Sequence, residues 1–207
     1  MSIKISFKNS SSKKTSTNLV LFVDEKFSTT PLKKLISNLE FSYINDLLKT
    51  SDLSKNLLVF ELSSKKKIVL ASIKKNIKVS EIENLGAELY GRINYGKNTE
   101  YSINSDSIIN NQNNFIGHFL HGLKLKSYEF KKYKSKKDSR QINISVLGNK
   151  NKLSTNDLLK FRALEDGTFY ARDLVSEPGN VLHPDEYAKR LSSLKKDGLK
   201  INIYDKK

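Results

Sequence analysis

The sequence of 207 residues contains no cysteine and no tryptophan, and it has only three prolines. Without cysteine the chain can form no disulfide, has no thiol nucleophile and offers no thiolate ligand to a metal ion. This composition fits a reducing compartment, so we expect a cytoplasmic protein. No apolar run approaches the roughly 18 residues that a membrane-spanning helix needs, and we expect no membrane partner.

Acidic residues are scarce relative to basic ones. The chain holds 37 Lys and Arg against 22 Asp and Glu, a formal net charge of +15. An excess of this size is typical of proteins that bind nucleic acid or acidic surfaces. The alternative is compositional, because a chain rich in Lys, Asn, Ile and Ser places lysines on every solvated face. The composition favours this second interpretation and leaves nucleic acid open as a partner.

Apolar patterning predicts strands and helices in alternation through residues 1–150. The expected strands are Ile3–Phe7, Leu19–Val23, Leu57–Leu62, Ile68–Ile73, Tyr101–Ile103 and Ile142–Leu147. The expected helices are Pro31–Leu39, Ile44–Leu48, Val79–Ile93 and Ile108–Leu125. This order indicates an α/β domain with a mixed central sheet and helices on its faces. We expect this first domain to be complete near Lys150.

A long helix is predicted from Ser154 to Val175, and we interpret residues 151–176 as a connector. Ser154 and Asp157 have the spacing of a capping box, and Gly167 would allow a kink. Residues 177–207 are interpreted as the incomplete start of a second α/β domain. They contain a predicted helix, Pro184–Lys196, which Gly198 ends, and a strand that begins at Leu199.

The segment Ala171–Asp185 is a predicted joint between two helices. Pro178 cannot continue a helix, and Gly179 and Asn180 favour a sharp turn. Pro184 then stands at the first position of the next helix, a position that proline favours.

The same segment, Ala-Arg-Asp-Leu-Val-x-Glu-Pro-x-Asn-Val-Leu-x-Pro, resembles the start of the catalytic domain of leucyl (cytosol) aminopeptidases. Lys124–Lys137 is similar to the helix end of that family followed by its Tyr-x-Phe-x-x-Tyr-Lys-x-Lys run. Leu47–Lys55 resembles, more loosely, the short acidic-apolar segment before the family's middle strands. The resemblance implies a macro-domain-like N-terminal domain, a metal-dependent exopeptidase and a homohexamer that acts on peptides. It also implies two divalent cations, manganese or zinc. Their ligands in the family come after the part matched here, so the resemblance assigns no catalytic, cofactor or metal residue to this chain.

Few residues suggest chemistry by themselves. His118 and His121 lie three apart on a predicted helix and could face one metal ion, but their apolar neighbours favour a structural role. We expect His183 to have a structural role in the turn of the joint. We expect Arg172 and Asp173 to form ion pairs at a helix end or between domains. The remaining acids lack the convergent spacing of a two-metal site: Asp24, Glu25, Asp138 and Glu177.

The run Lys124–Arg140 has a functional alternative of another class. Its eight Lys and Arg outnumber Glu129 and Asp138, which gives a local charge of 8 − 2 = +6. Tyr128, Phe130 and Tyr133 could stack on bases while the lysines neutralise phosphates. The structural alternative is a strand or loop whose aromatic rings face the core. The spacing of Tyr128 and Phe130 favours this alternative.

The sequence therefore predicts the N-terminal part of a leucyl aminopeptidase, without the residues that perform its chemistry. A basic nucleic-acid-binding module is the alternative.

Overall fold

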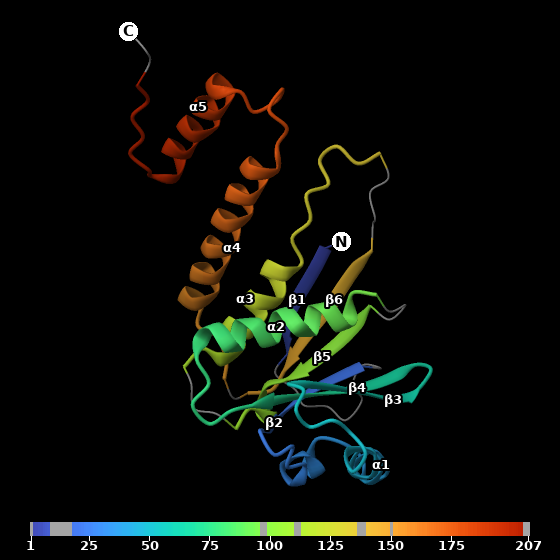
Figure 1. Cartoon of the computed structure of the whole chain (residues 1–207). Helices are drawn as coiled ribbons and strands as arrows, with labels where there is room; N and C mark the ends of the chain where they lie inside the picture. Colours follow the sequence, from blue (N-terminus) through green and yellow to red (C-terminus); the bar gives the residue numbers. More distant parts are fainter. Residues whose placement is uncertain are drawn as a thin grey trace. The chain divides into compact units, whose positions relative to one another are not determined.

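The computed structural model describes residues 2–8, 18–95, 99–109, 113–135, 140–149 and 151–204 (Figure 1). It divides into two compact units, which we call the N-terminal unit (Met1–Glu165) and the C-terminal unit (Asp166–Lys207). The division falls inside a continuous helix. The predicted boundaries at 150 and 176 stay predictions.

The N-terminal unit is built on a six-stranded sheet of order β1-β6-β5-β2-β4-β3. β3 and β4 pair antiparallel and all other neighbours are parallel. The strands are β1 (Ser2–Lys8), β2 (Asn18–Asp24), β3 (Leu57–Ser63), β4 (Lys66–Ile73), β5 (Glu100–Asn104) and β6 (Gln141–Leu147). The predicted α/β class and mixed sheet are confirmed.

Strand β2 is buried on both faces because both faces are covered by other elements. Its apolar run alternates, with Val20 and Phe22 on one face and Leu19 and Leu21 on the other. The first face packs on α2 (Val79–Ile93) and α3 (Phe115–Lys126), and the second on the 3-10 helix η1 (Thr30–Lys34) and α1 (Asn38–Leu48). A continuous apolar strand is typical of this doubly covered position.

Two helix boundaries differ from the sequence-based expectation. The predicted helix Pro31–Leu39 is a short 3-10 turn, and α1 restarts at Asn38 because Ser37 and Glu40 form a capping box. The predicted helix Ile108–Leu125 begins only at Phe115. Asn114, directly before it, has a left-handed backbone with φ of 58° that a helix cannot include. A 3-10 turn, η2 (Ser105–Ser107), precedes this segment.

Glycines allow α2 and α3 to cross at backbone distance. A Cβ atom on Gly86 would lie 1.9 Å from the carbonyl oxygen of Phe119, and one on Gly122 would lie 1.9 Å from that of Glu83. Both glycines are buried, and any side chain would push the helices apart. Close approach then lets Phe115 and Phe119 reach β2, where both rings meet Phe22 edge-on at 5.4 and 5.2 Å.

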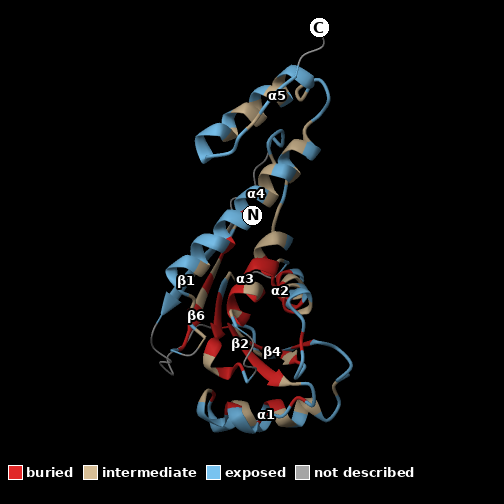
Figure 2. Ribbon diagram, turned by 90° about the vertical axis from the view of Figure 1, so that its left-hand side faces the viewer, coloured by how far each residue is buried: buried red, intermediate tan, exposed pale blue. Residues whose placement is uncertain are grey.

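The C-terminal unit begins within α4 (Thr155–Ser176) and continues through α5 (Pro184–Ser193) and the 3-10 helix η3 (Leu194–Asp197). Gly198 ends η3 in a left-handed conformation, as predicted. The strand predicted from Leu199 is not formed, because no described segment pairs with Leu199–Tyr204. Figure 2 shows the buried residues in the sheet and on α2 and α3, whereas none of residues 166–204 is buried. Among the described residues no helix is long and apolar enough to cross a membrane.

The crossing of α2 and α3 yields a test with a control on the same helix. We expect Gly86→Ala to lower the free energy of unfolding by about 1–3 kcal/mol, because the new methyl group overpacks the contact. Gly91→Ala, where a Cβ atom meets nothing within 4 Å, should instead raise it by about 0.5–1 kcal/mol. Urea titrations of both variants measure the difference. Equal effects at the two positions would contradict the crossing.

Candidate functional site

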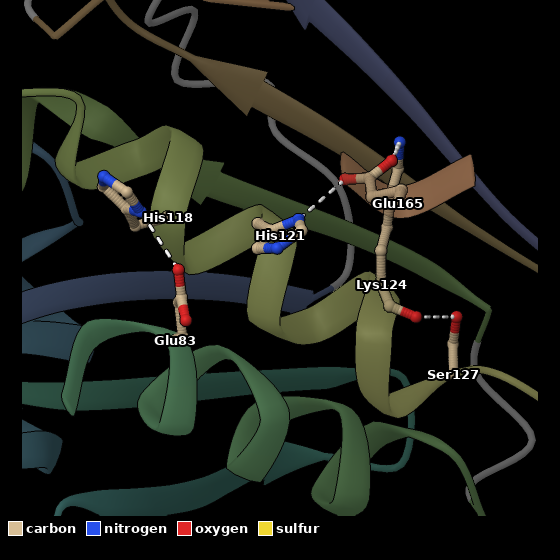
Figure 3. Close-up of polar contacts among 6 residues, drawn as sticks. All are labelled: Glu83, His118, His121, Lys124, Ser127 and Glu165. Atoms are coloured by element: carbon tan, nitrogen blue, oxygen red, sulfur yellow. Dashed lines mark hydrogen bonds and ion pairs between the residues drawn. The ribbon is translucent and has the colours of Figure 1, made fainter. Parts of the chain in front are cut away.

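The histidines of α3 do not converge on one point. His118 turns toward α2, where its Nδ1 lies 3.1 Å from Glu83 Oε1, and His121 turns toward α4, as Figure 3 shows. The ring of Phe161 on α4 packs near both imidazoles, with ring centroids 5.0 and 5.6 Å away. The spacing of three residues therefore places both histidines on the packed side of α3, but their imidazoles face different helices and cannot bind the same ion.

Glu165 is a buried carboxylate at the last residue of the N-terminal unit, and its residue is only 6% exposed. Lys124 Nζ donates to its Oε2 at 2.6 Å, and His121 Nδ1 lies 3.5 Å from its Oε1. Nδ1 of His121 is itself buried and makes no hydrogen bond with the described residues. A buried carboxylate has lost its hydration, so it needs hydrogen-bond donors or positive charge nearby, and Lys124 supplies both to Glu165. The cluster of Glu165, Lys124 and His121 thus ties α4 to α3.

Two further contacts fix the first turns of α4. The ring of Phe161 occupies the notch left by Gly117, where a Cβ atom would lie 2.2 Å from the ring. The predicted capping box is confirmed, since Asp157 and Ser154 exchange hydrogen bonds and Asp157 also accepts one from Asn114 at 2.8 Å. These contacts hold the first turns of α4 against α3 and the residue before it.

Metal binding has no support in this arrangement. Within the described ranges no group of three or more His, Cys, Asp or Glu side chains could hold a metal ion. The residues present do not fit the two divalent cations that the family resemblance implies. His118 and His121 are instead occupied by packing and by carboxylates on different helices.

The joint predicted from Pro178–Asn180 exists in the C-terminal unit. α4 ends at Ser176, and the N–H groups of Val181 and Leu182 both donate to the carbonyl of Pro178 at 2.9 Å. α5 begins at Pro184, with His183 at its N-cap position and acidic residues in its first turn. The turn thus connects α4 to α5 through seven residues, from Glu177 to His183.

Arg190 of α5 forms ion pairs with a glutamate before the turn of the joint and with one after it. Its guanidinium lies 2.8 Å from Glu177 Oε1 and 3.0 Å from Glu186 Oε1. The hydrogen bond from Arg190 holds the pKa of Glu186 below its ordinary value. Tyr170 of α4 donates from its hydroxyl to the carbonyl of Arg190 at 3.0 Å.

The other acidic candidates stay dispersed. Asp24 and Glu25 lie at the end of β2. Asp173, like Arg172, lies in the last turns of α4, and Asp138 lies outside the described residues. The expected pairing of Arg172 and Asp173 stays a prediction.

Sequence reasoning missed Glu165 and Arg190. Glu165 lies one helical turn after Phe161 on the buried side of α4. An acidic residue on the apolar side of a predicted helix is the sequence signal that could have identified it.

The described part of the basic run comprises residues 124–135 and Arg140: Lys124–Lys126 form the last turn of α3, and residues 127–135 form a loop. Tyr128 and Phe130 are half-buried, in line with the structural alternative, but Tyr133 is 53% exposed. Lys132 Nζ lies 5.8 Å above the Tyr133 ring, and Lys131 pairs with Glu129 at 2.5 Å. Nucleic-acid binding by this run stays a prediction.

The contribution of the buried Glu165 carboxylate to stability can be compared with that of an exposed carboxylate. We expect Glu165→Gln to lower the free energy of unfolding by about 1–3 kcal/mol, because charge-assisted bonds to Lys124 are lost in a buried setting. Glu61→Gln removes the same charge from a side chain that is 66% exposed and pairs with Lys67, so it should cost at most about 0.5 kcal/mol. Urea titration measures both, and hydrogen exchange of the amides of Phe161–Glu165 reports the docking of α4. If Glu165→Gln lowers the free energy of unfolding no more than Glu61→Gln does, Glu165 does not stabilise the contact between α3 and α4.

The basic loop yields a pH test. A hydrogen bond from Lys131 is the largest of several interactions that together lower the pKa of Glu129 from 4.5 to about 2. The folded pKa is depressed, so the stabilisation is present above pH 4.5 and is lost as the pH falls toward 2. We expect Lys131→Met to raise the pKa of Glu129 toward its ordinary value, measured by carboxyl ¹³C NMR. Lys132→Met removes the neighbouring charge and should leave it near 2. An identical titration in both variants would rule out Lys131 as the cause.

Comparisons with known proteins extend the sequence resemblance. No protein-family model matches the chain. A probable cytosol aminopeptidase of Bradyrhizobium sp. is 39% identical over 91 residues, which are 41% of this chain and 18% of that protein. A second, from Methylobacterium radiotolerans, is 37% identical over 94 residues, 43% of this chain and 19% of that protein. The matches thus span less than a fifth of these relatives.

Solved structures share the fold over nearly the whole chain. A tomato leucine aminopeptidase mutant superposes with a TM-score of 0.74 at 17% identity, covering 94% of this chain and 42% of that one. The bottromycin maturation enzyme BotP gives a TM-score of 0.63 at 11% identity, covering 93% and 40%. At these identities the likeness concerns the fold. The sequence matches agree with the family resemblance predicted from the sequence: the chain is similar to leucyl (cytosol) aminopeptidases over part of their length, and it shares the fold of a leucine aminopeptidase.

Proposed function

We propose that this chain is the N-terminal part of a metal-dependent leucyl aminopeptidase, an enzyme that releases N-terminal residues from peptides. In this proposal residues 1–150 form the macro-domain-like N-terminal domain and residues 151–176 the connector. Residues 177–207 open the catalytic domain. The enzyme is cytoplasmic and assembles as a homohexamer, as the family resemblance implies.

One observation carries this proposal: a single fold match runs across both units of the chain. The superposition on the tomato enzyme covers 94% of the chain, so it includes the helix α4 and residues on both sides of the joint. The relatives matched in sequence are named as cytosol aminopeptidases. A chain that shared only the N-terminal domain fold would support no statement about the joint.

We assign the chemistry to residues other than those described here. One solved relative, BotP, is a complex with manganese, which supports a divalent cation in the family. In the part of this chain that the structure describes, no side chains fit such an ion. The contribution of this chain is to fold the N-terminal domain, to anchor α4 through Glu165 and to set the turn at Pro178.

The chain alone should be inactive. With Mn²⁺ or Zn²⁺ and leucine amide we expect no hydrolysis above that of buffer, because the described residues bring together no group of metal ligands. The amount of ammonia released measures the rate. Turnover that scales with protein concentration and disappears with chelator would refute the assignment of chemistry to other residues.

A chimera tests the family role directly. Residues 1–207 replace the matching N-terminal region of the Bradyrhizobium enzyme, and we expect a leucine amide hydrolase that requires metal. The control deletes that region without replacement, which removes the anchor of the connector and should abolish assembly. A chimera that folds and assembles yet stays inactive would contradict the proposed role.

A further inference from the structure

Strand β1 lies at one edge of the six-stranded sheet, where it pairs with β6 along its inner side (Figure 1). No other described strand pairs with its outer side. A strand at a sheet edge turns unpaired N–H and C=O groups outward, and an extended peptide can form hydrogen bonds with them. The seven residues of β1 therefore offer a template for one more strand.

The side chains of β1 alternate between an apolar face and a basic face. Ile3 and Ile5 pack against the core that α2 and α3 cover, and Phe7 shares their face but is 44% exposed. Lys4 and Lys8 are exposed on the opposite face. The side chains of these two lysines form no ion pair or hydrogen bond with the described part of the chain. Their positive charge is thus available to a partner.

A small cavity of about 150 Å³ lies at the carboxyl end of β1. Its apolar walls come from β1, from β6 and from the segment that leads into α4: Phe7, Val146, Leu153 and Leu158. The volume is below the range of roughly 300–1,000 Å³ that holds whole small molecules. An apolar cavity of about this size accepts a benzene ring. It therefore fits one large apolar side chain, such as that of leucine or phenylalanine.

Hydrogen bonds hold the turn after β6, which lines the other side of this cavity. The N–H group of Asn149 donates to Asp106 Oδ1 at 3.0 Å. The side-chain amide of Asn151 donates to the carbonyl of Ser105 at 3.2 Å. Gly148 has a φ of +119°, in the region that favours glycine. The cavity is thus formed without a ligand, which lowers the cost of binding one.

The charges around this edge favour an acidic occupant. Lys8 and Lys152 both line the cavity and are exposed. Lys152, like Lys4 and Lys8, forms no ion pair with the described part of the chain. The whole chain carries a net charge of +15, which also attracts acidic segments.

A second copy of β1 is a poorer occupant. In an antiparallel pair centred on Ile5, Lys4 would oppose Ser6, but the lysines of both copies would share one face with no acid among them. A register shifted by two residues would place Lys4 opposite Lys4 or Lys8 of the second copy. Like charges directly opposite each other are destabilising. The lysines of β1 therefore disfavour pairing between copies.

We propose that the outer edge of β1 binds an extended acidic peptide of a partner protein, in which acidic residues alternate with large apolar ones. Opposed residues of paired strands point to the same face. The acids of the peptide therefore meet Lys4 and Lys8, and an apolar side chain opposite Phe7 enters the cavity beside Leu158. This binding is independent of the aminopeptidase chemistry proposed above, since it requires no metal and no residue of the C-terminal unit.

Fluorescence anisotropy of a labelled peptide titrated with the full chain tests the proposal. The peptide Glu-Leu-Glu-Phe-Glu-Leu-Glu, blocked at both ends, should bind with a Kd below about 1 mM, and added salt should weaken the binding. Hydrogen exchange of the β1 amides should slow in the complex, because outward N–H groups gain partners. The peptide in which lysine replaces every glutamate should bind at least about tenfold more weakly.

Charge reversal on β1 provides the matched variants. Lys4→Glu with Lys8→Glu should weaken binding of the acidic peptide about tenfold or more and should make the lysine peptide the tighter ligand. The control pair is Lys195→Glu with Lys196→Glu, which reverses the same charge on adjacent exposed lysines that do not line the cavity. It should leave the Kd of the acidic peptide unchanged within about twofold. Circular dichroism melting confirms that both double variants are folded.

Three results would overturn the proposal. The first is a Kd of the acidic peptide above about 1 mM, or equal to that of the lysine peptide, for the unaltered chain. The second is binding that leaves the exchange of the β1 amides unchanged, because the peptide would then lie elsewhere. The third is self-association that protects these amides while the peptide fails to do so, which would identify a second copy of the chain as the occupant.

Discussion

The parallel pairing of β2 with β4 and β5 is the constraint on which the N-terminal unit depends. β2 carries an apolar run that must be covered on both faces, and its two neighbours supply its backbone hydrogen bonds. Parallel neighbours require crossover connections, which bring helices to the faces. One face receives α2 and α3, and the other receives η1 and α1. The core follows from the same requirement.

The close crossing of α2 and α3 also determines which residues contact the first turns of α4. Backbone contact at Gly86 and Gly122 fixes α3, and α3 then presents Gly117, His121 and Lys124 to α4. The buried carboxylate of Glu165 cannot remain without positive partners, so it selects one placement for the first turns of α4. Beyond Glu165 the described chain contains no buried residue, and the ion pairs of Arg190 organise the joint instead. Packing thus orders the first unit, whereas polar contacts order the second.

The N-terminal unit offers two surfaces with different chemistry. The α3–α4 contact is closed, with its charges paired among themselves, and its role is to position a helix. The outer edge of β1 is open, with exposed lysines along it and a small cavity at its carboxyl end. The two surfaces therefore differ in how far their charged groups are open to solvent. The fold match by itself assigns a function to neither surface, because identities of 17% and 11% carry shape alone.

Local sequence determined the strands, the long helix α4 with its Ser154–Asp157 cap and the turn at Pro178, because each depends on neighbours within a few residues. It also carried the family resemblance at Ala171–Asp185. Tertiary structure decided where α3 begins, since Asn114 takes its left-handed conformation within the folded unit. It also decided that Leu199 begins no strand here, because a strand exists only through a partner. The environment of Glu165 and the cavity at the end of β1 likewise join residues far apart in the chain, and no local pattern encodes such convergence.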